Sequence, residues 1–188
     1  MYKAVIFDLD GTLLDSLNDI LAVLNETLKY FGLPQITREQ AQSYIGNGAR
    51  ELVHLAIGSD NVDRLNEILA YYKAEYAVSD NKLASLYEGE EEVLYALKER
   101  GVKIAILTNK PHAAAMRANG IFFEKFGFDL ILGQTDGIAL KPAPDAVYKI
   151  LKELRVKKEE CLFVGDGEAD VETAKNAGMD CVSVLWGY

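Results

Sequence analysis

The stretch Ala4-Val5-Ile6-Phe7-Asp8-Leu9-Asp10-Gly11-Thr12 places two acidic residues directly after a short run of apolar, β-prone side chains. An apolar run without polar alternation is typical of a strand buried on both faces of a parallel sheet. Similar apolar runs follow later in the chain, at residues 102–107, 129–132, 161–164 and 181–185. The sequence therefore predicts several parallel strands, the first of which ends at an acidic turn.

Helical patterns separate these runs. Amphipathic stretches or helix signals cover residues 90–100, 111–119, 144–154 and 169–177. Regular alternation of strand and helix predicts an α/β fold, namely a doubly wound, Rossmann-like parallel sheet. In such sheets, ligands bind beyond the carboxyl ends of the strands, and polar clusters follow those ends here.

The segment from Ser16 to about Leu83 interrupts the alternation, because it shows only helical patterns. Thr37 and Gln40 have the spacing of a capping box at a helix start. Tyr71, Tyr72 and Tyr76 lie at helical spacing and predict a core for this segment. We therefore expect a smaller all-helical cap domain, residues 16–83, inserted after strand 1 into an α/β catalytic core of residues 1–15 and 84–188. The hinges are expected near residues 14–17 and 82–87.

Charge and composition narrow the choice of partner. The 188 residues include 20 Lys and Arg against 29 Asp and Glu, a formal net charge of −9. Such a surplus repels nucleic-acid backbones and anionic headgroups. No run approaches the roughly 18 apolar residues of a membrane span, and Asp8 comes too early for a signal peptide. We expect a cytoplasmic monomer or homodimer with a small-molecule partner, no nucleic acid and no membrane.

The polar residues after the predicted strands form a chemically coherent set: Asp8, Asp10, Thr108, Asn109, Lys141, Asp166 and Asp170. Two carboxylates about 4 Å apart repel by roughly 4 kcal/mol at an effective dielectric constant near 20. A divalent cation and Lys141 would offset that repulsion, and oxygen ligands favour Mg²⁺. Hard-cation ligands with a lysine and neutral donors suit phosphoryl transfer, where catalysis is mostly positioning and charge neutralisation.

The segment 8–12 resembles the signature of the haloacid dehalogenase superfamily, in its phosphatase branch. Segments 107–110, 141–145 and 165–170 resemble the second, third and fourth motifs of that family, in the same order and over nearly the whole chain. Two departures stand out. Gly167 occupies a position where Ser or Thr is usual, and relatives usually continue through another strand and helix after the position of Tyr188.

The resemblance implies a role for each residue. Asp8 would be the nucleophile that forms an aspartyl-phosphate, and Asp10 would protonate the leaving oxygen and then activate water. Mg²⁺ would be held by Asp8, the backbone carbonyl of Asp10 and Asp166, with Asp170 as a further ligand or a residue behind the ligands. The phosphoryl group would be bound by Asp8, Leu9, Asp10, Thr108, Asn109 and Lys141.

The segment 44–53 is similar to the cap segment of phosphoglycolate phosphatases. Gly46, Asn47 and Gly48 precede a predicted helix, whose free N–H groups would face an anionic ligand, and Arg50 would pair with a substrate carboxylate. The resemblance thus implies 2-phosphoglycolate as substrate. The alternatives are a pyrophosphatase, a sugar-phosphate phosphatase or a β-phosphoglucomutase of the same superfamily. Outside enzymes, they are a phospho-aspartate signalling module and a non-catalytic interaction protein.

Some of these residues also have purely structural explanations. Thr108 is a good helix cap, and Asp170 suits the first turn of a helix. The Gly46–Gly48 segment is compatible with an ordinary interhelical turn, and an exposed helical Arg50 needs no function.

Overall fold

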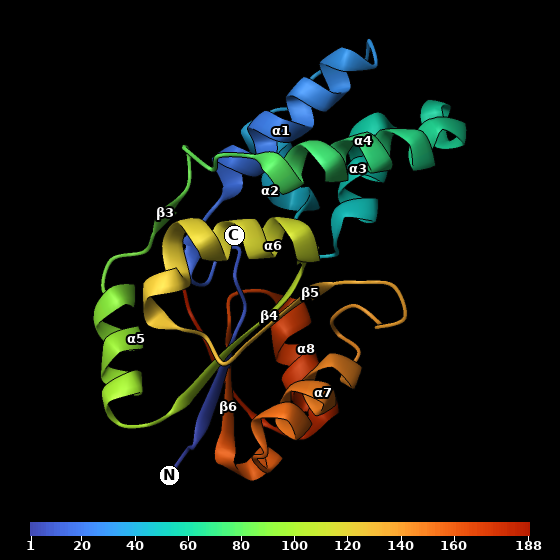
Figure 1. Ribbon diagram of the computed structural model, residues 1–188. Coiled ribbons are helices and arrows are strands. Elements are labelled where there is room, and N and C mark those ends of the chain that lie inside the picture. Colours follow the sequence, from blue (N-terminus) through green and yellow to red (C-terminus); the bar gives the residue numbers. More distant parts are fainter.

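The computed structural model describes all 188 residues and confirms the predicted parallel α/β fold. Five strands form the main sheet: β1 (Ala4–Phe7), β4 (Lys103–Pro111), β5 (Leu130–Gln134), β6 (Cys161–Gly165) and β7 (Asp180–Ser183). Their order is β5-β4-β1-β6-β7, and each neighbouring pair is parallel. The first strand is therefore central, and its acidic turn lies at the middle of the sheet edge (Figure 1).

The two faces of the sheet are covered by different helices, as a doubly wound fold requires. Ala4 and Ile6 of β1 pack with α7 (Asp145–Leu154) and α8 (Glu168–Ala177). Val5 and Phe7 point to the opposite face, where the covering elements are α5 (Glu90–Glu99), α6 (His112–Ala118), η2 (Asn119–Phe123) and η3 (Glu124–Phe126). A single turn, η4 (Lys158–Glu160), precedes β6.

The segment predicted to be helical contains α1 (Leu17–Tyr30), α2 (Arg38–Tyr44), α3 (Ala49–Ile57), η1 (Ser59–Arg64) and α4 (Leu65–Val78). These helices lie beyond the carboxyl end of β1 (Figure 1). They share an apolar core of their own, which includes Tyr72 and Tyr76 and touches the α/β part through Ala114. Thr37 and Gln40 form the predicted capping box at the start of α2.

Two short strands join the helical segment to the sheet. β2 (Leu14–Asp15) and β3 (Ser85–Leu86) pair antiparallel, with Leu14 opposite Leu86. The chain leaves and re-enters the α/β part at this ribbon, which holds the two connections side by side.

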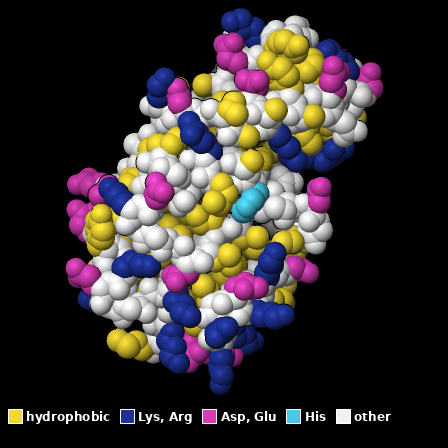
Figure 2. Space-filling view, in the orientation of Figure 1, with side chains coloured by type: hydrophobic (Ala, Val, Ile, Leu, Met, Phe, Trp, Pro, Cys, Tyr) yellow, Lys and Arg dark blue, Asp and Glu magenta, His cyan; other side chains and the backbone are white.

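Charged side chains of both signs are interspersed over the face seen in Figure 2. The structure also contains no helix that combines the length and the apolar character needed to cross a bilayer.

Candidate active site

The site begins where β1 ends. The backbone N–H of Asp8 donates to the carbonyl of Val164 at 2.8 Å, so the strand pairing reaches the acidic residue itself. The following turn requires glycine at position 11, where φ is +88° and a Cβ atom would stand 2.3 Å from the Asp166 carboxylate. Local backbone geometry therefore brings the turn after β1 against the acidic residue that follows β6.

Three carboxylates meet at this point. Oxygen atoms of Asp8, Asp166 and Asp170 lie within 4.8 Å of one another. The ammonium of Lys141 lies 2.7 Å from Asp8 Oδ1 and 2.6 Å from Asp170 Oδ1. The structure thus brings together four residues from three widely separated segments of the sequence, as the sheet topology predicted.

The three carboxylates differ in how they are held. Asp166 accepts hydrogen bonds from the Thr12 hydroxyl at 2.7 Å and from the backbone N–H of Tyr188 at 3.1 Å. Asp170 accepts from Lys141 and, at 3.0 Å, from the backbone N–H of Gly167. Asp8 Oδ1 is buried and pairs only with the Lys141 ammonium, and no side chain or backbone group of the protein donates to Asp8 Oδ2. Asp8 is therefore the carboxylate left with an uncommitted oxygen.

Burial and crowding change the ionisation of the cluster. Burial, and next the charge of Asp170, raise the pKa of Asp8 to about 8, although Lys141 opposes the shift. Burial also raises the pKa of Asp166. Burial lowers the pKa of Lys141, but the neighbouring Asp8 and Asp170 reverse this and raise it above its usual value. Oxygen-only donors with excess negative charge fit a hard divalent cation such as Mg²⁺.

The end of β4 supplies neutral donors. Thr108 and Asn109 are both buried and line the same pocket as Asp8 and Lys141. The Asn109 amide donates to the carbonyls of Gly46 and Lys141, at 2.9 and 3.1 Å, and its oxygen accepts from the Lys141 N–H at 2.9 Å. The Asn109 side chain therefore ties two loops together, whereas the Thr108 hydroxyl proton has no acceptor in the protein.

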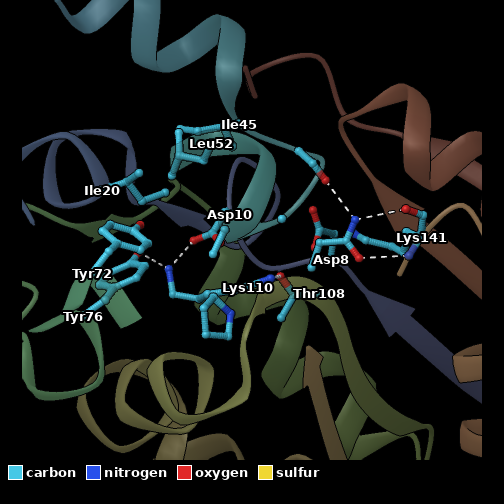
Figure 3. Close-up of a pocket in the computed structure, with 15 residues that line it drawn as sticks. Asp8, Asp10, Ile20, Ile45, Leu52, Tyr72, Tyr76, Thr108, Lys110 and Lys141 are labelled. Carbon is cyan, nitrogen blue, oxygen red and sulfur yellow. Dashed lines mark hydrogen bonds and ion pairs between the residues drawn. The ribbon is translucent and has the colours of Figure 1, made fainter. Parts of the chain in front are cut away.

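Asp10 faces a different set of residues. Its Oδ1 atom accepts from the Ser16 hydroxyl at 2.5 Å and from the Lys110 ammonium at 2.7 Å. Lys110 is only 5% exposed, also donates to the Tyr76 hydroxyl, and lies 4.3 Å from the centre of the Tyr76 ring. Figure 3 shows Lys110 and Lys141 on opposite sides of the pocket.

Lys110 is the site residue that the sequence analysis missed. Its position directly after Thr108 and Asn109, at the end of a buried strand, was the available signal. The pairing of β4 with β5 shifts register between Leu107 and Pro111. Such an irregularity breaks the strict alternation of side chains, and here the four consecutive residues 108–111 all line one pocket.

The helical segment closes the other side of the pocket. Gly46 and Gly48 line it, and Asn47 borders the adjoining opening near Asp166. Gly48 is the N-cap of α3 and has φ of +85°, and a Cβ atom there would stand 3.0 Å from the side chain of Leu140, in the loop after β5, and 3.5 Å from the Asn109 carbonyl oxygen of β4. Leu9, predicted to bind phosphate, has a buried side chain in the apolar core, which leaves only its backbone for that role.

Arg50 is not where the sequence analysis placed it. Its side chain is exposed, does not line the pocket, and donates to Asn66 of α4 at 2.9 Å. The physical reason is the phase of α3: Ala49 and Leu52 face the pocket, so Arg50 points away from it. The structure therefore corrects the prediction that Arg50 reaches a substrate carboxylate.

Known proteins are similar to this chain over nearly its whole length. The family model of haloacid dehalogenase-like hydrolases matches residues 5–184. The chain belongs to this family. Phosphoglycolate phosphatase 1 of Pseudomonas aeruginosa is 37% identical over 193 residues, which cover 99% of this chain and 70% of that protein. The phosphoglycolate phosphatase of Aquifex aeolicus is 35% identical and covers 99% of this chain and 86% of its own.

A solved structure agrees with this assignment. The crystal structure of a predicted phosphoglycolate phosphatase from Haemophilus somnus superimposes with a TM-score of 0.84 at 30% identity. The match covers 100% of this chain and 87% of the other. The acidic cluster described above therefore lies in a haloacid dehalogenase-like hydrolase fold over essentially the whole chain.

Proposed function

We propose that this protein is a Mg²⁺-dependent phosphomonoesterase that works through an aspartyl-phosphate on Asp8, and that its substrate is 2-phosphoglycolate. The observation that carries the proposal is the buried cluster of Asp8, Lys141, Asp166 and Asp170, in which Asp8 keeps an uncommitted oxygen. The relatives named phosphoglycolate phosphatase support the choice of substrate.

In the first half of the proposed reaction, an oxygen of Asp8 attacks phosphorus, and the bond from phosphorus to the leaving oxygen breaks. The leaving oxygen takes its proton from Asp10, which Ser16 and Lys110 hold beside the pocket. In the second half, Asp10 removes a proton from water, which attacks phosphorus and releases phosphate. Asp8 is regenerated, so the cycle is balanced.

The charges of the site are assigned as follows. Asp8, the carbonyl of Asp10 and Asp166 would hold Mg²⁺, which when bound neutralises negative charge on the transferred phosphoryl group. Lys141 also offsets the negative charge of the transferred phosphoryl group. Asp170 orients the Lys141 ammonium through their 2.6 Å ion pair. Asp170 therefore positions Lys141, and because its oxygen lies within 4.8 Å of those of Asp8 and Asp166, it is also the candidate for a further metal ligand.

We also propose that residues 16–83 act as a cap on the core formed by 1–15 and 84–188. The ribbon of β2 and β3 provides closely spaced connections on which such a cap would move. The Gly46–Gly48 loop already contacts the core through the Asn109 amide, so opening of the cap would admit substrate and its return would exclude bulk water.

The test is phosphate release from 2-phosphoglycolate by the purified chain, with Mg²⁺ and with an excess of chelator. We expect many turnovers with Mg²⁺, none with chelator, and none for the folded Asp8→Asn variant. Release of a single equivalent would instead indicate a signalling module, and no release at all would indicate an interaction protein. Preference for pyrophosphate or a sugar phosphate, or turnover that needs a hexose bisphosphate primer, would contradict the proposed substrate.

A further inference from the structure

The pocket between the sheet and the helical segment carries one lysine at each end. Among the residues that line it, Lys110 and Lys141 are the only cations, since Arg50 points elsewhere. Lys141 is committed to the phosphoryl end through its ion pairs with Asp8 and Asp170. Lys110 lies across the pocket from Lys141 (Figure 3), beside Asp10 and Tyr76 and not beside Asp8.

The surroundings of Lys110 leave room for an anion. The ammonium donates to Asp10 and to the Tyr76 hydroxyl, which accounts for two of its three N–H bonds. The Tyr76 ring covers one side of the Lys110 ammonium, with its centre 4.3 Å from the nitrogen. The side chains of Ile20, Ile45 and Leu52 line the same pocket. A buried cation in such a setting attracts an anion far more strongly than an exposed lysine does, because water does not screen it.

We propose that Lys110 forms the subsite for the carboxylate of the substrate. This inference rests on the proposed phosphatase function and deepens it, because it names the residue that selects a phosphorylated acid over a neutral phosphomonoester. The third N–H bond of the ammonium makes a charge-assisted hydrogen bond to the carboxylate, while Lys141 serves the phosphoryl group at the other end.

The size of the pocket agrees with a short substrate. Tyr72 and Tyr76 of α4 wall off the Lys110 end, and both are almost fully buried. In 2-phosphoglycolate a single methylene separates the carboxylate from the ester oxygen, so one small molecule carries both anionic groups in close succession. The site discriminates because, when the carboxylate is missing, one buried N–H bond of the Lys110 ammonium is left without an acceptor.

The experiment compares three substrates on the full chain with Mg²⁺: 2-phosphoglycolate, ethyl phosphate and 4-nitrophenyl phosphate. Ethyl phosphate also has an alkyl leaving group that needs an acid, but it lacks the carboxylate. The aryl ester lacks the carboxylate and has a leaving group that needs little acid catalysis. The variants are Lys110→Met, Lys110→Arg and, as a matched control, Lys152→Met, which changes an exposed lysine of α7.

We expect Lys110→Met to lower the ratio of kcat/KM for 2-phosphoglycolate to that for ethyl phosphate by about thirtyfold, the effect of losing one charge-assisted hydrogen bond. Lys110→Arg should retain part of the ratio, and Lys152→Met all of it. An unchanged ratio in Lys110→Met, with both alkyl phosphates slowed equally and the aryl ester spared, would show that Lys110 only positions Asp10 and would overturn the subsite.

Failure of the underlying phosphatase function would give a different result. In that case the unmodified protein would hydrolyse none of the three esters, and both proposals would fall together. A protein that hydrolyses all three esters, with no preference for 2-phosphoglycolate, would overturn only the carboxylate subsite. If Lys110→Met fails to fold, the Lys110→Arg variant decides: a partly lowered ratio supports the subsite, and an unchanged ratio with both alkyl phosphates slowed equally overturns it.

Discussion

Asp8 is the residue at which stability and function oppose each other. It is buried beside Asp170, and its pKa is raised to about 8, so ionised Asp8 is unfavourable in the folded protein without a cation. We expect Asp8→Asn to abolish turnover and yet to raise the free energy of unfolding of the metal-free protein, at about pH 8, by at least about 1 kcal/mol. Chemical denaturation in the presence of chelator measures this, and a destabilised variant would contradict it.

The same residue makes Mg²⁺ binding dependent on pH. The pKa of Asp8 is raised in the folded state, so between about pH 4 and pH 8 the folded protein holds a proton that the unfolded chain has lost. Without metal, this group therefore lowers stability progressively as the pH rises through that window. Mg²⁺ must displace the proton, so its affinity should increase from about pH 6 to about pH 8.

Calorimetry in two buffers with different ionisation enthalpies tests this linkage. We expect release of nearly one proton for each Mg²⁺ bound at about pH 6, and less at about pH 8. Equal affinity and no proton release at both pH values would mean that Asp8 is ionised throughout. In that case the crowding of the cluster would not control its protonation.

At the scale of single elements, the strands were predictable and the phases of the helices were not. The end of each buried strand is marked by apolar residues that give way to polar ones, and parallel topology brings those ends to one edge. This reasoning found Asp8, Lys141 and Asp166. It placed Arg50 wrongly because the direction of a helical side chain depends on how the helix packs, which a 9-residue sequence does not determine.

The contact between β5 and α6 shows how tightly an element is fixed near the site. A Cβ atom at Gly133 would stand 2.8 Å from both His112 Cα and the Lys110 carbonyl oxygen, which are backbone atoms. We expect Gly133→Ala to destabilise the protein by about 1–3 kcal/mol, because the backbone must move to admit the methyl group. It should also slow turnover, since Lys110 moves with its carbonyl.

Gly120 offers a matched control for this prediction. It is exposed in η2, and no atom lies within 4 Å of the position of its Cβ. Gly120→Ala should be neutral or stabilise the protein by up to about 1 kcal/mol. Urea denaturation measures the free energy of unfolding of both variants. Equal changes would mean that the backbone between β5 and α6 moves at little cost to admit the methyl group.

At the scale of the whole molecule, residues 186–188 link the acidic cluster to the start of the helical segment. The Trp186 indole donates to the Thr12 carbonyl at 3.1 Å, and the backbone N–H of Tyr188 donates to Asp166. The Tyr188 hydroxyl accepts from the backbone N–H groups of Ser16 and Leu17, at 2.6 and 2.8 Å. No spacing rule in the sequence predicts the contacts of the Tyr188 hydroxyl. They join residues more than 170 positions apart through a single aromatic side chain.

The Tyr188 hydroxyl is placed where the helical segment begins, so its loss should affect the whole molecule. Tyr188→Phe leaves two N–H groups at the start of α1 without their acceptor, and we expect a loss of about 1–3 kcal/mol in the free energy of unfolding. Ser16 also holds Asp10, so kcat for an alkyl phosphate should fall more than kcat for an aryl phosphate. The control is Tyr95→Phe, which changes an exposed tyrosine packed on Phe126. It should change neither the free energy of unfolding nor the relative kcat values for alkyl and aryl phosphates. If the two variants behave alike in denaturation and in both assays, the Tyr188 hydroxyl does not connect the entrance of the helical segment to Asp10.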